Sequence, residues 1–434
     1  MITDTAGQQY RRLTQEPALD GIRGIAVLTV TAWHYSSDIL QQPLEFFKAG
    51  HLGVDLFFVL SGFLITSLLL NEYQRNGRIS FSGFYRRRAF RLLPAILVFL
   101  PVHFIWAALN DVPAGPLTGG TEMRNEIASV LTALFFSINI LTLLGDFTAT
   151  VGIGHLWSLA VEEQFYFIWP LLMVTLLRTG RRPFLGSAGI TALLVVFSGH
   201  FLVWDGLAAL PRMGVSLTVG VAVLALLAAG QRLPLDLRPL PTLAILVVAV
   251  LLFRNGLFDG SPHSRMLLYG MLPSRADSLI VGAMLAILWV SGRVPHRCPT
   301  GFAIAGWIVL GWMVARVSLQ DDFFFGAGWT LSALCGALIL WGALGSQGTL
   351  YGRILTMPWL RAIGKVAYGL YIWHVFVFVV VKYGFPDESL LVRTVLALSI
   401  TAAVTTASWF LVERPMLAYK SAPGVPGDAG KATS

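Results

Sequence analysis

The feature that most constrains this chain is a series of apolar stretches, each close to the length of a membrane-spanning helix. A helix that crosses a bilayer needs about 20 consecutive apolar residues. Only 12% of the 434 residues are charged, whereas a soluble domain has about 25%. The chain therefore lacks the polar surface that would enclose so large an apolar content in water. The sequence predicts an all-α, polytopic helical membrane protein with about 10–12 transmembrane helices.

Twelve of these stretches are candidate spans. If the N-terminus is cytoplasmic, they place most Lys and Arg residues on the cytoplasmic side, as the positive-inside rule requires. The stretch 127–144 is also apolar, but counting it as a crossing would reverse the orientation of every later loop. We therefore expect a re-entrant or interfacial helix there. The candidate spans are 21–40, 51–71, 92–110, 156–177, 186–203, 213–230, 240–254, 273–291, 302–317, 327–345, 362–383 and 391–412.

The expected domain organisation is simple. Residues 1–18 form a polar cytoplasmic segment and residues 19–417 form the membrane domain. Residues 418–434, rich in Gly, Pro and Ala, form a disordered cytoplasmic tail. Both termini are thus expected in the cytoplasm, and the expected location is the inner (plasma) membrane. The net charge of +8 is spread over short loops, so no nucleic-acid binding is expected, and the two cysteines do not have metal-ligand spacing.

Ionisable residues inside a bilayer are costly and usually functional. His34 follows Arg23 by eleven positions, which places it roughly 16 Å deeper in the membrane. An isolated histidine on an apolar helix is often a packing residue, so its neighbours matter. Asp55 lies near the outer start of the next span, and a short loop can bring it to His34. A histidine that donates to a carboxylate is a competent general base.

Two further carboxylates, Glu162 and Glu163, lie at the outer end of the span 156–177. Adjacent residues point about 100° apart on a helix. Only one of the two is therefore expected to face the bundle interior, and the other is expected at the interface. The alternative is an interfacial belt formed with Trp157, Tyr166 and Trp169.

On the cytoplasmic side, Arg88 and Arg91 lie three positions apart on one helical face. A pair of guanidinium groups matches phosphate oxygens well, so we expect these two residues to bind a phosphorylated ligand. The alternative is that these arginines only set the orientation of the chain in the membrane. We favour that interpretation for the neighbouring Arg86 and Arg87.

Five positions are possible acceptor-binding or supporting residues, with weaker signals: Glu163, Arg275, Asp277, Tyr371 and His374. Arg275 and Asp277 lie at an outer helix start, where a carboxylate can simply favour the helix dipole. His374 lies within a span beside Tyr371, and its role stays open. No role is assigned to the other histidines, which are His51, His103, His155, His200, His263 and His296.

Taken together and in order, five segments resemble the acyltransferase-3 family of bacterial membrane acyltransferases. They are LDGIRGIAVLTVTAWHY, GVDLFFVLSGFLI, RRAFRLLP, LWSLAVEEQFYFIWP and YGLYIWH, and they extend from about residue 18 to residue 415. Many family members carry an extracytoplasmic SGNH hydrolase-like domain after the last span. This chain is expected to be the stand-alone form without that domain.

The resemblance implies acyl-CoA as a co-substrate, with no bound cofactor or metal. It also implies a hydroxyl acceptor, either a sugar, a lipid-linked glycan of the cell envelope or a glycosylated natural product. Residues that match the family pattern are Arg23, His34, Asp55, Arg88, Arg91 and Glu162.

These expectations together give one mechanism, and they leave two alternative functions open. Arg88 and Arg91, with Arg23 nearby, bind CoA at the cytoplasmic mouth of the site. His34, oriented by Asp55 or Glu162, removes the acceptor proton. A covalent acyl-histidine intermediate is a variant of this mechanism. The alternative functions are a proton-coupled transporter or flippase and a non-catalytic receptor or scaffold. The identity of the acceptor and the length of the acyl chain stay open.

Overall fold

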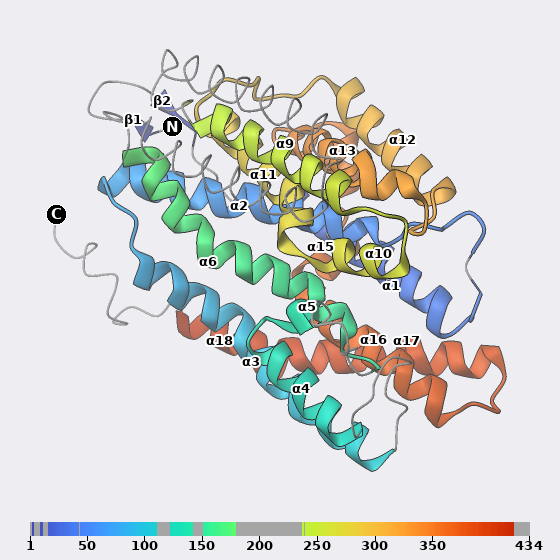
Figure 1. Ribbon diagram of the computed structural model, residues 1–434. Helices are drawn as coiled ribbons and strands as arrows, with labels where there is room; N and C mark the ends of the chain where they lie inside the picture. The colour runs from blue at the N-terminus through green and yellow to red at the C-terminus, as the bar shows by residue number, and fades with distance from the viewer. Residues whose placement is uncertain are drawn as a thin grey trace, which may run out of the picture.

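The computed structural model describes residues 2–3, 9–11, 16–42, 44–110, 122–141, 151–178, 237 and 239–420. These residues are almost entirely helical (Figure 1). The strands among the described residues are β1 (Ile2–Thr3) and β2 (Gln9–Tyr10), which pair antiparallel. The predicted spans 186–203 and 213–230 lie outside the described residues, as does most of the predicted tail.

The described residues form the following helices, given in chain order. They are α1 (Pro17–Asp38), α2 (Leu52–Asn76), α3 (Phe81–Leu109), α4 (Glu122–Leu134), α5 (Ile138–Leu141), α6 (Trp157–Arg178), α9 (Pro239–Leu257), α10 (Pro262–Gly270), α11 (Leu272–Val290), α12 (Thr300–Arg316), α13 (Trp329–Ala343), α14 (Leu350–Leu355), α15 (Pro358–Lys365), α16 (Ala367–Gly384), α17 (Leu390–Ser408) and α18 (Arg414–Lys420). A 3₁₀ turn, η2 (Gly154–Leu156), leads into α6, and two π-helical turns, η5 (Phe324–Gly328) and η6 (Trp409–Glu413), precede α13 and α18.

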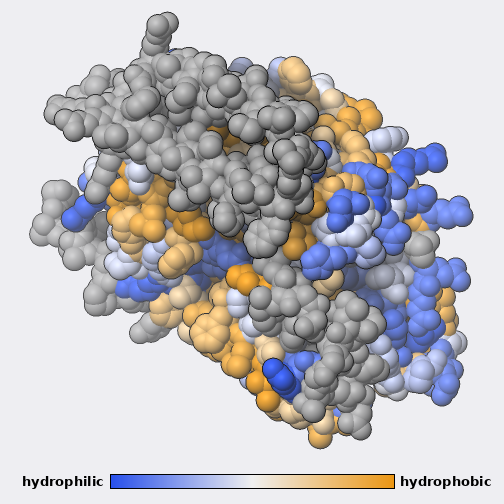
Figure 2. All heavy atoms as spheres, in the orientation of Figure 1, coloured by the Kyte–Doolittle hydropathy of each residue, from blue (hydrophilic) through white to orange (hydrophobic). Residues whose placement is uncertain are grey.

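Within the described residues, 8 helical segments are long and apolar enough to cross a membrane. Eight predicted spans correspond to these segments, and the prediction of a polytopic helical membrane protein is confirmed. Two more predicted spans correspond to α1, whose hydropathy is lowered by Arg23 and His34, and to α12, which has 17 residues. Large apolar side chains are exposed on the outward faces of α3, α6, α12 and α17. Figure 2 shows apolar residues over much of the coloured surface, with many of the hydrophilic residues at the right end of the view.

The apolar stretch 127–144 does not form one long helix in its described part. Helix α4 has 13 residues and ends at Leu134, and Phe136 then adopts a left-handed conformation with φ 51°. A helix of 13 residues is too short to cross a bilayer. The exclusion of this stretch as a full helical crossing therefore agrees with the structure.

The predicted span 362–383 was wrong at its start. The chain breaks at Val366, so that α15 ends at Lys365 and the long helix α16 begins at Ala367. Helix α15 lies against α1, where Gly364 approaches the backbone carbonyl of Asp20 too closely for any side chain. This backbone contact requires α15 to lie along α1 as a separate short helix.

The centre of the bundle is the crossing of α2 and α11, which pack closely over much of their length. Two glycines permit this approach. A Cβ atom on Gly62 would overlap the carbonyl of Leu279, and one on Gly282 would overlap the carbonyl of Val59. Helix packing in membranes depends on such small residues because lipid offers no hydrophobic drive between helices.

We expect Gly282→Ala to destabilise the protein, since the added methyl meets backbone that cannot move without separating the helices. Overpacking of this kind costs about 1–3 kcal/mol. Gly311→Ala is the matched control, because nothing lies within 4 Å of a Cβ at this helical position. Thermal unfolding in detergent measures both variants. Equal midpoints for the two would show that the crossing is not tightly packed.

Candidate active site

A cavity of about 360 Å³ opens among α1, α2, α3, α6, α15, α16 and the C-terminal helical segment. It is apolar along α2 but has polar groups at both ends. The polar lining residues are Asp20, Arg23, Ser61, Arg88, Arg91, Ser158, Glu162, Tyr166, Lys365, Tyr368, Tyr371 and Glu413. The structure thus brings together four residues predicted as donor-binding or catalytic (Arg23, Arg88, Arg91, Glu162) and one supporting residue, Tyr371.

The cations of this cavity differ in how they are paired. Arg88 donates to Glu163 through Nε and Nη2, at 3.0 and 2.7 Å, and lies over the ring of Tyr166. Arg23 pairs with Asp20 at 2.8 Å. Arg91 and Lys365 have no hydrogen bond or ion pair to any other described residue, and both are exposed. The two arginines expected to bind phosphate therefore differ in availability. Glu163 already neutralises Arg88, whereas Arg91 pairs with no described residue.

Glu162 and Glu163 both face the interior, so the prediction that one would be interfacial was wrong. Glu162 accepts hydrogen bonds from Ser61 of α2 and, at 3.4 Å, from Tyr166. Glu163 binds Arg88 of α3, and both of these side chains are largely buried. Two successive positions can be buried because α6 lies between α2 and α3. Neither carboxylate contacts His34.

Beyond one end of the cavity lies a cluster of three histidine rings, His34, His155 and His374. His34 Nδ1 and His374 Nε2 are 3.2 Å apart. The ring of His155 lies 5.4 Å from that of His374 and 6.2 Å from that of His34, between centroids. His374, whose role the sequence left open, is fully buried, and His34 is partly exposed.

His155 is the member of this cluster that sequence analysis missed. It lies in the turn η2, which follows Gly152, a residue with φ 91°. Its Nε2 lies 3.2 Å from the carbonyl of Ile372, so it donates to the backbone of α16. The available signal was its position directly before the LWSLAVEEQFY segment, whose other polar residues also face inward.

Tyr371 separates the cavity from the histidine cluster. Its hydroxyl donates to the carbonyl of His155 at 2.7 Å and accepts from Ser158 at 2.5 Å. Its ring lies 5.3 Å from that of His155 and 5.7 Å from that of His374. Tyr371 and Ser158 line the cavity but His34 does not. The base expected from the sequence is therefore one layer of side chains beyond the cavity wall.

Asp55 does not orient His34, and this expected contact was wrong. Asp55 accepts from Arg275 at 2.9 and 3.0 Å and from Ser278 at 3.0 Å. Asp55 and Arg275 are both fully buried. The reason lies in the packing, since Asp55 is on the face of α2 that meets α11, whereas His34 is on the face of α1 that meets α16.

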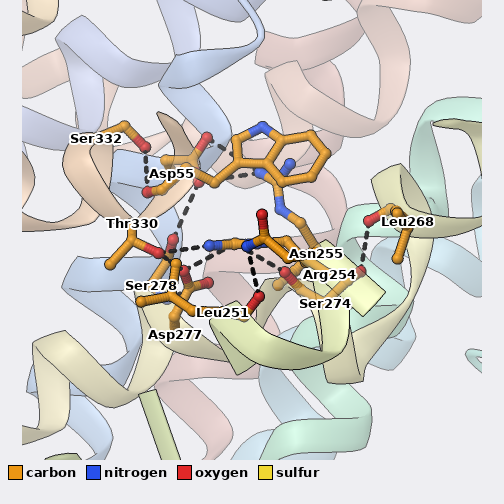
Figure 3. A network of polar contacts seen from close by, with 12 residues as sticks. Asp55, Leu251, Arg254, Asn255, Leu268, Ser274, Asp277, Ser278, Thr330 and Ser332 are labelled. Carbon is orange, nitrogen blue, oxygen red and sulfur yellow. Dashed lines mark hydrogen bonds and ion pairs between the residues drawn. The ribbon is translucent and has the colours of Figure 1, made fainter. Parts of the chain in front are cut away.

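Asp277 belongs to a second buried pair close to the first (Figure 3). It accepts from Arg254 of α9 at 2.9 Å and from Thr330 of α13 at 2.5 Å. Arg254 also donates to the carbonyl of Ser274 at 3.0 Å. Arg275 and Asp277 were considered possible helix-dipole partners. They instead hold α2, α9, α11 and α13 together through buried charges.

No group of three or more His, Cys, Asp or Glu residues among the described positions could hold a metal ion. The arrangement is a bundle of membrane-length helices around a cavity with cations at one end and a histidine cluster behind the other. Fold and site together define a multi-pass membrane protein with a cavity between its helices that charged and polar side chains help to line.

A family model described as "Acyltransferase domain" matches residues 16–413 of this chain, and the chain belongs to that family. The resemblance to the acyltransferase-3 family is thereby confirmed.

The relatives of this chain carry acetyltransferase names. It is 27% identical over 423 residues to "Putative O-acetyltransferase SAS0844" of Staphylococcus aureus, covering 94% of this chain and 58% of the relative. It is 26% identical over 367 residues to "Peptidoglycan O-acetyltransferase OatA" of Listeria monocytogenes, covering 82% and 48%. A third relative, "Putative peptidoglycan O-acetyltransferase YrhL" of Bacillus subtilis, is 26% identical, covering 92% and 54%. The chain thus spans about half the length of these curated relatives. No solved structure matches it.

Proposed function

We propose that this protein is a membrane O-acyltransferase that moves an acetyl or other short acyl group from acyl-CoA to a hydroxyl of a carbohydrate. The observation that carries the proposal is the cavity. At one end it has cations that pair with no described residue, and histidines lie directly behind the other end. A CoA thioester has its phosphates at one end and its reactive carbonyl at the other, so it matches this division. The relatives named for peptidoglycan favour a glycan of the cell envelope as the acceptor.

The donor enters from the end that carries Arg91 and Lys365. An exposed cation without a partner is available to bind phosphate, whereas Arg88 would first have to release Glu163. The volume of about 360 Å³ is near the lower end for ligand sites. A cavity of this volume suits the narrow chain of acyl-CoA that ends in the thioester, with the nucleotide part of the donor outside the cavity. In the orientation that puts most basic residues inside, this end faces the cytoplasm and the protein lies in the plasma membrane.

His34 is the proposed general base. As the acceptor oxygen bonds to the thioester carbonyl carbon, His34 takes the hydroxyl proton, and the carbon–sulfur bond then breaks. The proton passes from His34 to the departing thiolate, so CoA leaves as a free thiol. The thioester must pass Tyr371 and Ser158 to reach this ring, since those two residues form the cavity wall.

The direct test uses purified protein in proteoliposomes with acetyl-CoA and a peptidoglycan fragment. Acceptor-dependent release of free thiol, together with an acetyl group on the glycan, is the expected result. A transporter or flippase would release no thiol. Absence of thiol release with glycan acceptors would contradict the proposal.

Arg91→Ala is expected to raise the Michaelis constant for acyl-CoA by about 10- to 100-fold, as loss of a charged hydrogen bond predicts. Lys365→Ala should act in the same direction. The matched control is Arg87→Ala on the same helix, because Arg87 is exposed and paired with Glu72 outside the cavity. Initial rates at varied donor concentration measure the effect. An unchanged Michaelis constant in Arg91→Ala would remove this residue from the donor site.

A further inference from the structure

The hydrogen-bond partners of the histidine cluster determine which ring nitrogens carry protons. His34 Nδ1 lies 3.1 Å from the carbonyl of Val30, and His374 Nδ1 lies 2.9 Å from the carbonyl of Leu370. A carbonyl oxygen can only accept a hydrogen bond. Both Nδ1 atoms must therefore carry hydrogen in this arrangement.

The contact between the two rings then has one direction. Since His374 Nδ1 holds a proton, the Nε2 atom of a neutral His374 has a lone pair and can only accept. The single Nδ1–H of His34 is therefore shared between His374 Nε2, at 3.2 Å, and the Val30 carbonyl, at 3.1 Å. A proton on His374 Nε2 would face the hydrogen on His34 Nδ1 and repel it. The consequence for His34 is that its own Nε2 is left without a proton.

The position of His374 is constrained on several sides. Its ring is fully buried and packs edge-on against Phe378, with a centroid distance of 5.9 Å. One turn earlier on α16, Tyr371 is tied to the carbonyl of His155 and to Ser158. The helix that carries His374 also packs directly on α1. The acceptor atom facing His34 is therefore held in place by the fold.

We propose that His374 is a positioning residue that, together with the Val30 carbonyl, orients the His34 ring in the Nδ1–H tautomer, so that His34 Nε2 is the atom that accepts the hydroxyl proton. This role rests on the proposed function of His34 as the base. A carboxylate commonly orients a catalytic histidine, but here a neutral imidazole does so. When His34 becomes a cation during transfer, its Nδ1–H becomes a stronger donor, and the bond to His374 stabilises that state.

The kinetic test compares two substitutions of His374. His374→Gln places an amide oxygen near the original Nε2 and can still accept, whereas His374→Leu cannot. We expect kcat to fall by about 10- to 100-fold in His374→Leu, with the donor Michaelis constant unchanged and the pH profile of kcat shifted. His374→Gln should recover most of kcat, and both variants should unfold at similar temperatures. Equal kcat losses in the two variants would overturn the proposal.

A second measurement does not depend on activity. In the full chain labelled with ¹⁵N-histidine and reconstituted in nanodiscs, His34 and His374 should show the Nδ1–H tautomer, and His155 the Nε2–H tautomer. His34→Ala and His374→Leu assign the two signals, and His263→Gln, at an exposed histidine, is the labelling control. A His34 signal from the Nε2–H tautomer would refute the positioning role. If His34→Ala retained full turnover while the tautomers were as expected, the proposed role of His34 as the base would fail, and the role of His374 in catalysis with it.

Discussion

His34→Ala is expected to lower acyl transfer by about 10²- to 10⁴-fold, the usual contribution of a positioned general base. The ring of His34 lies next to His374 and behind the wall formed by Tyr371 and Ser158. Alanine removes the base but leaves the helix intact, since it has the highest helix propensity. Thiol release from acetyl-CoA in proteoliposomes measures the loss.

The control for this experiment is His263→Ala, which removes an exposed histidine from α10. It should retain normal turnover, and both variants should elute and unfold like the parent protein. Substantial turnover in a folded His34→Ala protein would exclude this ring as the base. His155 would then be the candidate base, because it is the other member of the cluster with a ring nitrogen that has no hydrogen bond to a described residue.

The second large effect is on stability and concerns the buried pair of Asp55 and Arg275. Arg275→Leu is expected to destabilise the protein by about 3–5 kcal/mol, because it leaves the Asp55 carboxylate buried without its countercharge. Both side chains are almost completely buried, and the pair joins α2 to α11 at the centre of the bundle. Denaturation in mixed micelles, followed by tryptophan fluorescence, measures the free energy of unfolding.

Two further variants separate the pair from its surroundings. The double variant Asp55→Leu with Arg275→Leu should recover much of the loss, since apolar replacement of a whole buried pair is often neutral. Arg265→Ala breaks the pair with Asp322, whose side chain is 74% exposed, and should cost less than about 1 kcal/mol. If Arg275→Leu abolished transfer at unchanged stability, a direct catalytic role for Asp55 would be restored.

Placing the base behind the cavity has a chemical consequence for the proposed reaction. A thioester near water hydrolyses, and enclosure of the site limits that side reaction. Tyr371 and Ser158 close the cavity through their mutual hydrogen bond. Tyr371 lies one turn before His374 on α16. This one turn of helix therefore both lines the proposed donor cavity, through Tyr371, and contacts the proposed base His34, through His374.

The amino-acid sequence alone determined the class of this protein and most of its polar positions. The recurrence of apolar stretches predicts a helical membrane protein, because every backbone group that crosses lipid must bond within its own helix. For the same reason charged residues within those stretches are few and informative. Arg23, Arg88, Arg91, Glu162 and Tyr371 could all be selected in this way, and the structure gathers them around one cavity.

Only the tertiary structure decided which of these side chains meet. Periodicity along one helix says nothing about which face of a distant helix it will contact, so Asp55 was assigned to His34 although α11 supplies its partner, Arg275. His34 instead meets His374, which lies 340 positions away in the sequence. Pairing across such separations is set by helix packing, and in this bundle that packing depends on backbone contacts at glycines such as Gly62.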